Sequence, residues 1–91
     1  MTAAADRQDI IAKLSDILDR VTTGRVKASQ VSEDASIFDN LGLSSLELLE
    51  LRWEIESTWN IQLDDQDITH LKVVSDVINL IAERTAPKAG A

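Results

Sequence analysis

Cysteine is absent from this chain of 91 residues, and histidine occurs once. Without cysteine the chain can form no disulfide, no thiolate zinc site and no cysteine nucleophile. A Ser-His-Asp hydrolase needs an orienting scaffold and an oxyanion hole around its histidine, and a small helical bundle offers little room for them. A chain of this length fits one small domain, which buries too little surface to enclose a large active site. The sequence therefore argues against an enzyme.

Basic residues are also scarce, with 9 Lys and Arg against 16 Asp and Glu and a net charge of -7. A nucleic-acid binder would need a basic footprint, so we expect no nucleic-acid partner. A partner with a basic surface is favoured, because opposite potentials steer association. No apolar run approaches transmembrane length, and no apolar signal region follows the charged residues Asp6 and Arg7. We expect a cytoplasmic monomer that does not bind membranes.

Apolar residues recur at helical spacing in three segments and predict an all-α bundle, whereas no segment shows the alternation of a strand. The first helix has Thr2 or Asp6 as its candidate cap. We expect the domain to occupy residues 1–85 and a flexible tail to follow over 86–91. The expected elements are main helices that hold Ile10 to Val21, Ser45 to Trp59 and Val74 to Arg84, and a short helix near Asp64 to Ile68.

The connection over residues 24–44 is long for a small domain and is polar. Scattered apolar residues predict that it is ordered and pinned to the core, with a short helical turn near Ser36 to Asp39. We expect Phe38 and Trp59 to fill the junction between the helices. The apolar positions of this connection are Val26, Val31, Ile37, Phe38, Leu41 and Leu43.

The second helix carries two apolar lines, which is more than one buried stripe requires. Leu48, Leu51, Ile55 and Trp59 form the line expected to face the core. The other line then lies near the surface among acidic residues, and an exposed apolar patch of this kind usually marks a binding surface. That patch consists of Leu46, Leu49 and Trp53, with Glu47, Glu50, Glu54 and Glu56 beside or between them.

The start of this helix reads as a capping box, in which Ser44 and Glu47 each satisfy a free N–H group. Ser45 follows directly, so its hydroxyl lies at a helix N-terminus, where free N–H groups and the helix dipole favour an attached anion. Taken alone, without its neighbours, Ser45 indicates only a solvent-exposed serine of a first turn. His70 near Asp64, Asp65 and Asp67 lacks the ligand number and spacing of a metal loop, and we expect no metal site.

The chain resembles the acyl carrier protein family, including its peptidyl and aminoacyl carrier relatives, over roughly residues 10 to 84. Family members typically show a loop ending in Leu-Gly-x-Asp-Ser-Leu and then an acidic helix. The matching residues are Phe38-Asp39-Asn40-Leu41-Gly42-Leu43-Ser44-Ser45-Leu46-Glu47-Leu48-Leu49-Glu50-Leu51, Glu54-Ile55-Glu56-Ser57-Thr58-Trp59-Asn60-Ile61-Gln62-Leu63 and Val74-Ser75-Asp76-Val77-Ile78.

The resemblance implies a carrier and not a catalyst. A phosphopantetheinyl transferase would join 4'-phosphopantetheine to Ser45, and the arm's thiol would hold an acyl group as a thioester for acyl-loading and acyl-processing enzymes with basic docking surfaces. The family's recognition helix implies that these partners bind Leu46, Glu47, Leu49, Glu50, Trp53 and Glu54.

One residue departs from the family pattern, because Ser44 stands where Asp is common. Serine caps a helix about as well as aspartate, so the helix start is kept while one negative charge beside the attachment site is lost. The cargo stays open among fatty acyl, polyketide, aminoacyl and other acyl groups. An unmodified acidic interaction module that docks into a basic groove is the alternative function.

Overall fold

The computed structural model describes residues 7–85, so the candidate caps Thr2 and Asp6 and the predicted tail over 86–91 lie outside the described residues. The described part confirms the all-α prediction, with an isolated bridge between Ser36 and Val73 in place of any strand. The elements in chain order are α1 (Arg7–Val21), the 3-10 turn η1 (Ala28–Gln30), α2 (Ser45–Trp59), α3 (Asp65–Thr69) and α4 (Val74–Thr85).

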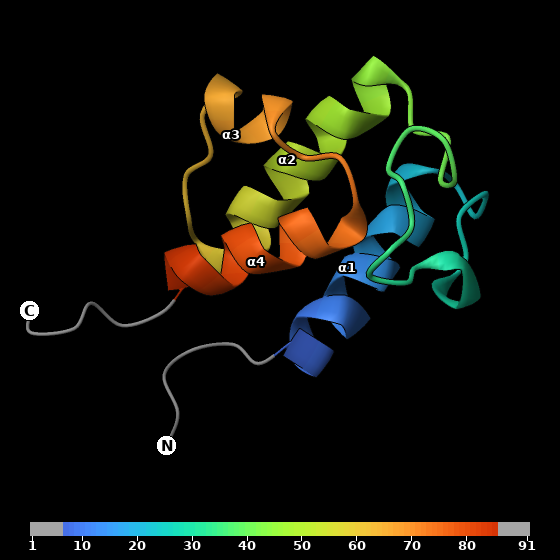
Figure 1. Ribbon diagram of the computed structural model, residues 1–91, viewed down its shortest axis with the longest axis horizontal. Coiled ribbons are helices and arrows are strands. Elements are labelled where there is room, and N and C mark those ends of the chain that lie inside the picture. The colour runs from blue at the N-terminus through green and yellow to red at the C-terminus, as the bar shows by residue number, and fades with distance from the viewer. Residues whose placement is uncertain (1–6, 86–91) are drawn as a thin grey trace, which may run out of the picture.

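The three long helices pack around one apolar core. Helix α1 contacts both α2 and α4, and α2 also contacts α4. The short α3 lies in the segment that leads from α2 to α4 (Figure 1). Each of the three long helices turns its predicted apolar line toward this core, because those side chains lie on one face of a 3.6-residue repeat. Ile11, Val21, Leu48 and Trp59 of these lines are only partly buried. The most deeply buried side chains are Ile10, Leu14, Leu18, Val26, Ile37, Leu51, Ile55, Val74, Val77, Ile78 and Ile81.

Two of the helix ends follow from local backbone chemistry. Helix α1 is terminated by Thr23 and Gly24, which both adopt positive φ, at 52° and 85°. Helix α2 ends at Asn60, which has the left-handed conformation with φ of 55° and donates its N–H to the carbonyl of Glu56. Asparagine tolerates this conformation better than most residues, and the predicted end of the helix at Asn60 is confirmed.

The long connection between α1 and α2 is ordered and pinned to the core, as predicted, and it lies at one end of the molecule (Figure 1). The prediction for Phe38 was wrong, since this side chain is 48% exposed. Its neighbour Ile37 is 1% exposed and takes the core position. In the tight turn, where the N–H of Asn40 donates to the carbonyl of Ser36 at 3.0 Å, successive side chains point in different directions. Trp59 is half-buried and packs against the core.

Backbone hydrogen bonds tie this connection to the start of α4. The N–H of Ile37 donates to the carbonyl of Lys72 at 2.9 Å, and the N–H of Val74 donates to the carbonyl of Ala35 at 2.9 Å. Because the first N–H groups of a helix have no partner within the helix, the bond from Val74 satisfies a donor that would otherwise be left open. The loop that leads into α2 is therefore held in place by the last helix.

Candidate functional site

The junction of the long loop with α2 forms the predicted capping box. The Ser44 Oγ accepts from the N–H of Glu47 at 3.1 Å, and the Glu47 Oε1 accepts from the N–H of Ser44 at 3.0 Å. Ser44 has extended backbone angles, with φ of −81° and ψ of 169°, as a residue outside the helix should. Ser45 is the first residue of α2, and its side chain is exposed. Of the two adjacent hydroxyls, the one on Ser44 is thus engaged with the backbone.

Arg25 reaches this junction from the beginning of the long connection. Its Nη1 donates to the carbonyl oxygens of Leu41 and Gly42, at 3.0 and 3.2 Å. Its Nη2 donates to the Oε1 of Glu47, the same oxygen that accepts from the N–H of Ser44. A planar guanidinium can make such contacts simultaneously because its donors form a rigid fork. Arg25 thereby connects the loop before Ser45 with the first turn after it.

Gly42 makes the approach of Arg25 possible. Its φ is 65°, which lies in the left-handed region that glycine adopts without steric cost. A Cβ at this position would lie 3.3 Å from the Arg25 Nη1. The glycine in the Leu-Gly-Leu-Ser-Ser-Leu segment therefore serves both the turn of the backbone and the contact with the guanidinium.

The surroundings of Glu47 favour its charged form. The hydrogen bond from Arg25 lowers the pKa of this carboxyl below its ordinary value, and the N–H of Ser44 lowers it further. Hydrogen bonds to a carboxylate favour ionisation because they are stronger with the charged oxygen. The start of α2 therefore keeps a negative charge next to the exposed hydroxyl of Ser45, although Arg25 already pairs with that charge.

The outward face of α2 carries the exposed apolar line that the sequence predicted. Leu46, Leu49 and Trp53 are 63%, 38% and 57% exposed, whereas Leu51 and Ile55 on the opposite face are 2% and 1% exposed. Trp53 lies between two surface hollows. The smaller has a volume of about 390 Å³ and is lined by Arg20, Val21, Glu50, Trp53 and Glu54. We call Leu46, Leu49 and Trp53 the α2 apolar face.

The acidic residues beside this face are less available than their spacing indicated. Glu47 pairs with Arg25, and Glu54 pairs with the Arg20 Nη2 at 2.7 Å. Glu50 forms no ion pair within residues 7–85. The sequence reasoning missed these pairings, because Arg20 and Arg25 precede their partners by 34 and 22 residues and only the packing of α1 against α2 brings them together.

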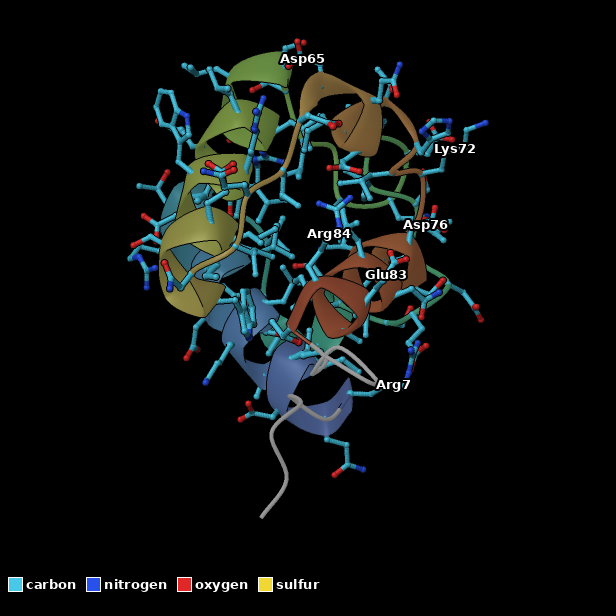
Figure 2. All side chains as sticks on the ribbon, turned by 90° about the vertical axis from the view of Figure 1, so that its left-hand side faces the viewer. Arg7, Asp65, Lys72, Asp76, Glu83 and Arg84 are labelled. Carbon is cyan, nitrogen blue, oxygen red and sulfur yellow. The ribbon has the colours of Figure 1, made fainter. Side chains whose placement is uncertain are left out.

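The larger hollow lies at the other end of α2 and has a volume of about 830 Å³. Its wall includes Arg84 of α4 (Figure 2). Arg84 donates to the carbonyl of Gln62 at 2.9 Å and pairs with Asp67 of α3 at 2.7 Å. Ser45 does not line this hollow. The arginine contacts hold α3 and the loop before it against α4.

Two other features of the described residues bear on function. Over residues 7–85, no group of three or more His, Cys, Asp or Glu side chains is placed to hold a metal ion. The Nδ1 of His70 instead lies 2.7 Å from the carbonyl oxygen of Gln66. None of the helices in this part of the chain is long and apolar enough to cross a membrane.

Comparison with known proteins places the chain among phosphopantetheine-bearing carriers. The family model described as a phosphopantetheine attachment site matches residues 8–81. An acyl carrier protein of Thermotoga maritima is 32% identical over 80 residues, covering 88% of this chain and 96% of the relative. The meromycolate extension acyl carrier protein of Mycolicibacterium aurum is 33% identical over 90 residues, covering 97% of this chain and 91% of the relative.

Solved structures show the same fold. The crystal structure of an acyl carrier protein from Thermotoga maritima superposes with a TM-score of 0.74 at 24% identity, over 86% of this chain and 88% of that one. The solution structure of the oxytetracycline acyl carrier protein gives a TM-score of 0.67 at 24% identity, over 89% of this chain and 90% of that one.

Proposed function

Because this chain belongs to the acyl carrier protein family, we propose that Ser45 is the residue to which its 4'-phosphopantetheine is attached. The chain is a carrier and not an enzyme, and its partners are enzymes that load or process the cargo. The bound group supplies a terminal thiol that holds an acyl group as a thioester. What remains for the protein is to present one hydroxyl for attachment and one surface for recognition.

The exposure of Ser45 at the first position of α2 is the observation that carries the proposal. A phosphate joined there lies beside the N–H groups of the first helical turn and at the positive end of the helix dipole. The neighbouring Ser44 is exposed too, but its Oγ accepts from the N–H of Glu47 at 3.1 Å. Modification of Ser44 would disturb this cap, whereas modification of Ser45 leaves it intact.

Intact-mass measurement after incubation with coenzyme A and a broad-specificity phosphopantetheinyl transferase tests the assignment. We expect the wild-type chain to gain the mass of one phosphopantetheine group and Ser45→Ala to gain none. Ser44→Asp is the matched control, because aspartate caps a helix about as well as serine, and this variant should be modified. A mass gain in Ser45→Ala would refute the assignment. An unmodified interaction module, the alternative function, predicts no gain in any chain.

We also propose that the α2 apolar face is the docking surface for the transferase and for acyl-loading and acyl-processing enzymes. Leu46 and Leu49 lie within one turn of Ser45, so a bound partner reaches the attachment site directly. Trp53 is the candidate anchor, because it is exposed and large aromatic residues carry much of the energy of interfaces. These partners would have basic docking surfaces, and Glu50 offers them a carboxylate that has no ion pair within residues 7–85. The carboxylates of Glu47 and Glu54 already pair with Arg25 and Arg20, so a partner's cations would have to replace these arginines.

The docking proposal predicts that Trp53→Ala weakens binding to the transferase by about 1 to 3 kcal/mol through faster dissociation. Gln8→Ala, at an exposed position at the start of α1, should leave binding unchanged. Equal affinities of Trp53→Ala and the wild type would remove Trp53 from the interface. The cytoplasm remains the predicted location of these encounters, and cell fractionation tests it.

A further inference from the structure

We infer that Arg25 is a positioning residue for phosphopantetheine transfer, holding the backbone of the loop before Ser45 and the Glu47 side chain of the turn after it. This inference rests on the proposed attachment at Ser45. Within residues 7–85, Arg25 is the one side chain that hydrogen-bonds to the loop before this serine and to the helical turn after it. It makes no recorded contact with Ser45 itself, so its action is on the position of the hydroxyl.

The geometry of the contacts explains the effect. The Nη1 of Arg25 holds the carbonyls of Leu41 and Gly42 at 3.0 and 3.2 Å, which fixes the last turn of the loop. The Nη2 holds Glu47, whose carboxylate in turn accepts from the N–H of Ser44 at 3.0 Å. Ser45 lies between these anchored points on an otherwise exposed segment. Holding a reacting group near its productive geometry lowers the barrier that the transferase must overcome.

Arg25 also acts on charge, and the two effects have opposite signs. The guanidinium of Arg25 neutralises the carboxylate of Glu47. Replacing Arg25 by an uncharged residue therefore makes the start of α2 more negatively charged and should favour encounter with a basic transferase. Loss of the backbone contacts should instead slow the transfer step. A positioning role therefore predicts that kcat falls while KM for the carrier does not rise. A purely electrostatic role predicts a lower KM with unchanged kcat.

Three variants separate these possibilities when the full chain is the substrate of the transferase and coenzyme A is saturating. Arg25→Met keeps much of the side-chain volume but removes every donor, and we expect kcat to fall about two- to fivefold, the range that one exposed ion pair supports. Arg25→Lys keeps the charge without the fork and should recover only part of the loss. Arg7→Met is the matched control, since Arg7 is similarly exposed and pairs with Glu33 away from the site. Equal kcat values for Arg25→Met, Arg7→Met and the wild type would overturn the inference.

A second measurement does not depend on transfer. In the unmodified chain, NMR titration should show a higher pKa for Glu47 in Arg25→Met than in the wild type, because the strongest hydrogen bond to this carboxylate is lost. The amide of Glu47 should also exchange faster with solvent, as its cap partner Ser44 becomes less restrained. If the pKa of Glu47 and the exchange rate of its amide are the same in Arg25→Met and the wild type, Arg25 does not hold this turn and the inference is wrong. The two proposals can fail separately. If the Glu47 pKa and amide exchange change as expected but the wild type is modified at Ser44, the proposed attachment at Ser45 is wrong, while Arg25 still holds the start of α2.

Discussion

Trp53 and Ile55 are two residues apart on α2 and face opposite sides of it, with side chains 57% and 1% exposed. Two residues of an α-helix subtend about 200°, so one side chain meets solvent when the other meets the core. The recognition surface and the core contact of this helix are therefore carried by different residues, and substitutions can address them separately.

The first prediction separates these two roles. Ile55→Ala should lower the free energy of unfolding by about 2 to 5 kcal/mol, because it leaves a cavity in a closely packed core. Trp53→Ala should change it by less than about 0.5 kcal/mol, as is usual for exposed positions. Urea denaturation followed by circular dichroism measures both without relying on tryptophan fluorescence. A large loss of stability in Trp53→Ala would show that Trp53 supports the fold.

The second prediction concerns Gly42, whose φ is 65° and whose missing Cβ leaves room for Arg25. Gly42→Ala should destabilise the fold by about 1 to 2 kcal/mol from the left-handed backbone alone. Chemical denaturation gives this value, with Ser57→Ala on the exposed side of α2 as the control. In the double variant Gly42→Ala/Arg25→Met, the new Cβ no longer meets a guanidinium. Adding Gly42→Ala to Arg25→Met should therefore lower the free energy of unfolding only by the amount due to the left-handed backbone.

The third prediction concerns Arg20, whose Nη2 forms an ion pair with the Oε1 of Glu54 at 2.7 Å. Arg20→Gln should release this carboxylate and increase affinity for a basic transferase by about two- to fivefold. The gain should shrink at high salt, because exposed charges are screened. Titration calorimetry at two salt concentrations measures both effects. Arg7→Gln removes the same charge far from α2, so an equal gain in that variant would assign the effect to net charge alone.

The fourth prediction is a pH dependence at the start of α4. The N–H groups of Lys72 and Val73 donate to the Oδ2 of Asp76 at 2.9 and 3.1 Å and lower the pKa of this carboxyl below its ordinary value of 3.8 (Figure 2). Because the folded-state pKa is the lower one, Asp76 stabilises the fold above the ordinary pKa and loses this contribution as pH falls through the folded-state value.

Asp76→Asn should accordingly be less stable than the wild type at neutral pH. The difference in the free energy of unfolding should stay constant down to about pH 5 and shrink at lower pH. Urea denaturation of both chains across this pH range measures the difference in their free energies of unfolding. The other carboxylates are present in both chains, so the effect of protonating them cancels in this difference. A difference that does not vary with pH would contradict the assignment of the lowered pKa to these two N–H groups.

The parts of this fold that the sequence predicted are those governed by local rules. Helix α2 was predicted with its observed bounds, since the capping box of Ser44 and Glu47 and the left-handed Asn60 are both read from neighbouring residues. The outward position of Trp53 also followed from helical spacing. These features depend on separations of a few residues, which a sequence displays directly.

The missed features depend on packing between distant segments. The pairing of Arg25 with Glu47 and of Arg20 with Glu54 requires the crossing of α1 and α2, which no spacing encodes. Phe38 was expected to fill the junction between the helices, but Ile37 is the buried residue there, and its N–H donates to the carbonyl of Lys72. The turn η1 carries no apolar repeat and gave no signal.

The backbone bonds between the long loop and the start of α4 have a consequence for the order of events during synthesis. The carbonyl of Ala35 accepts from the N–H of Val74, and the N–H of Ile37 donates to the carbonyl of Lys72, so the start of α4 completes the loop that leads to Ser45. A nascent chain that has emerged only as far as α2 already contains the serine but lacks these partners. Since chains emerge from their N-terminus, we expect the loop to become fully ordered only once α4 has emerged. We therefore expect attachment of the prosthetic group to follow the emergence of α4.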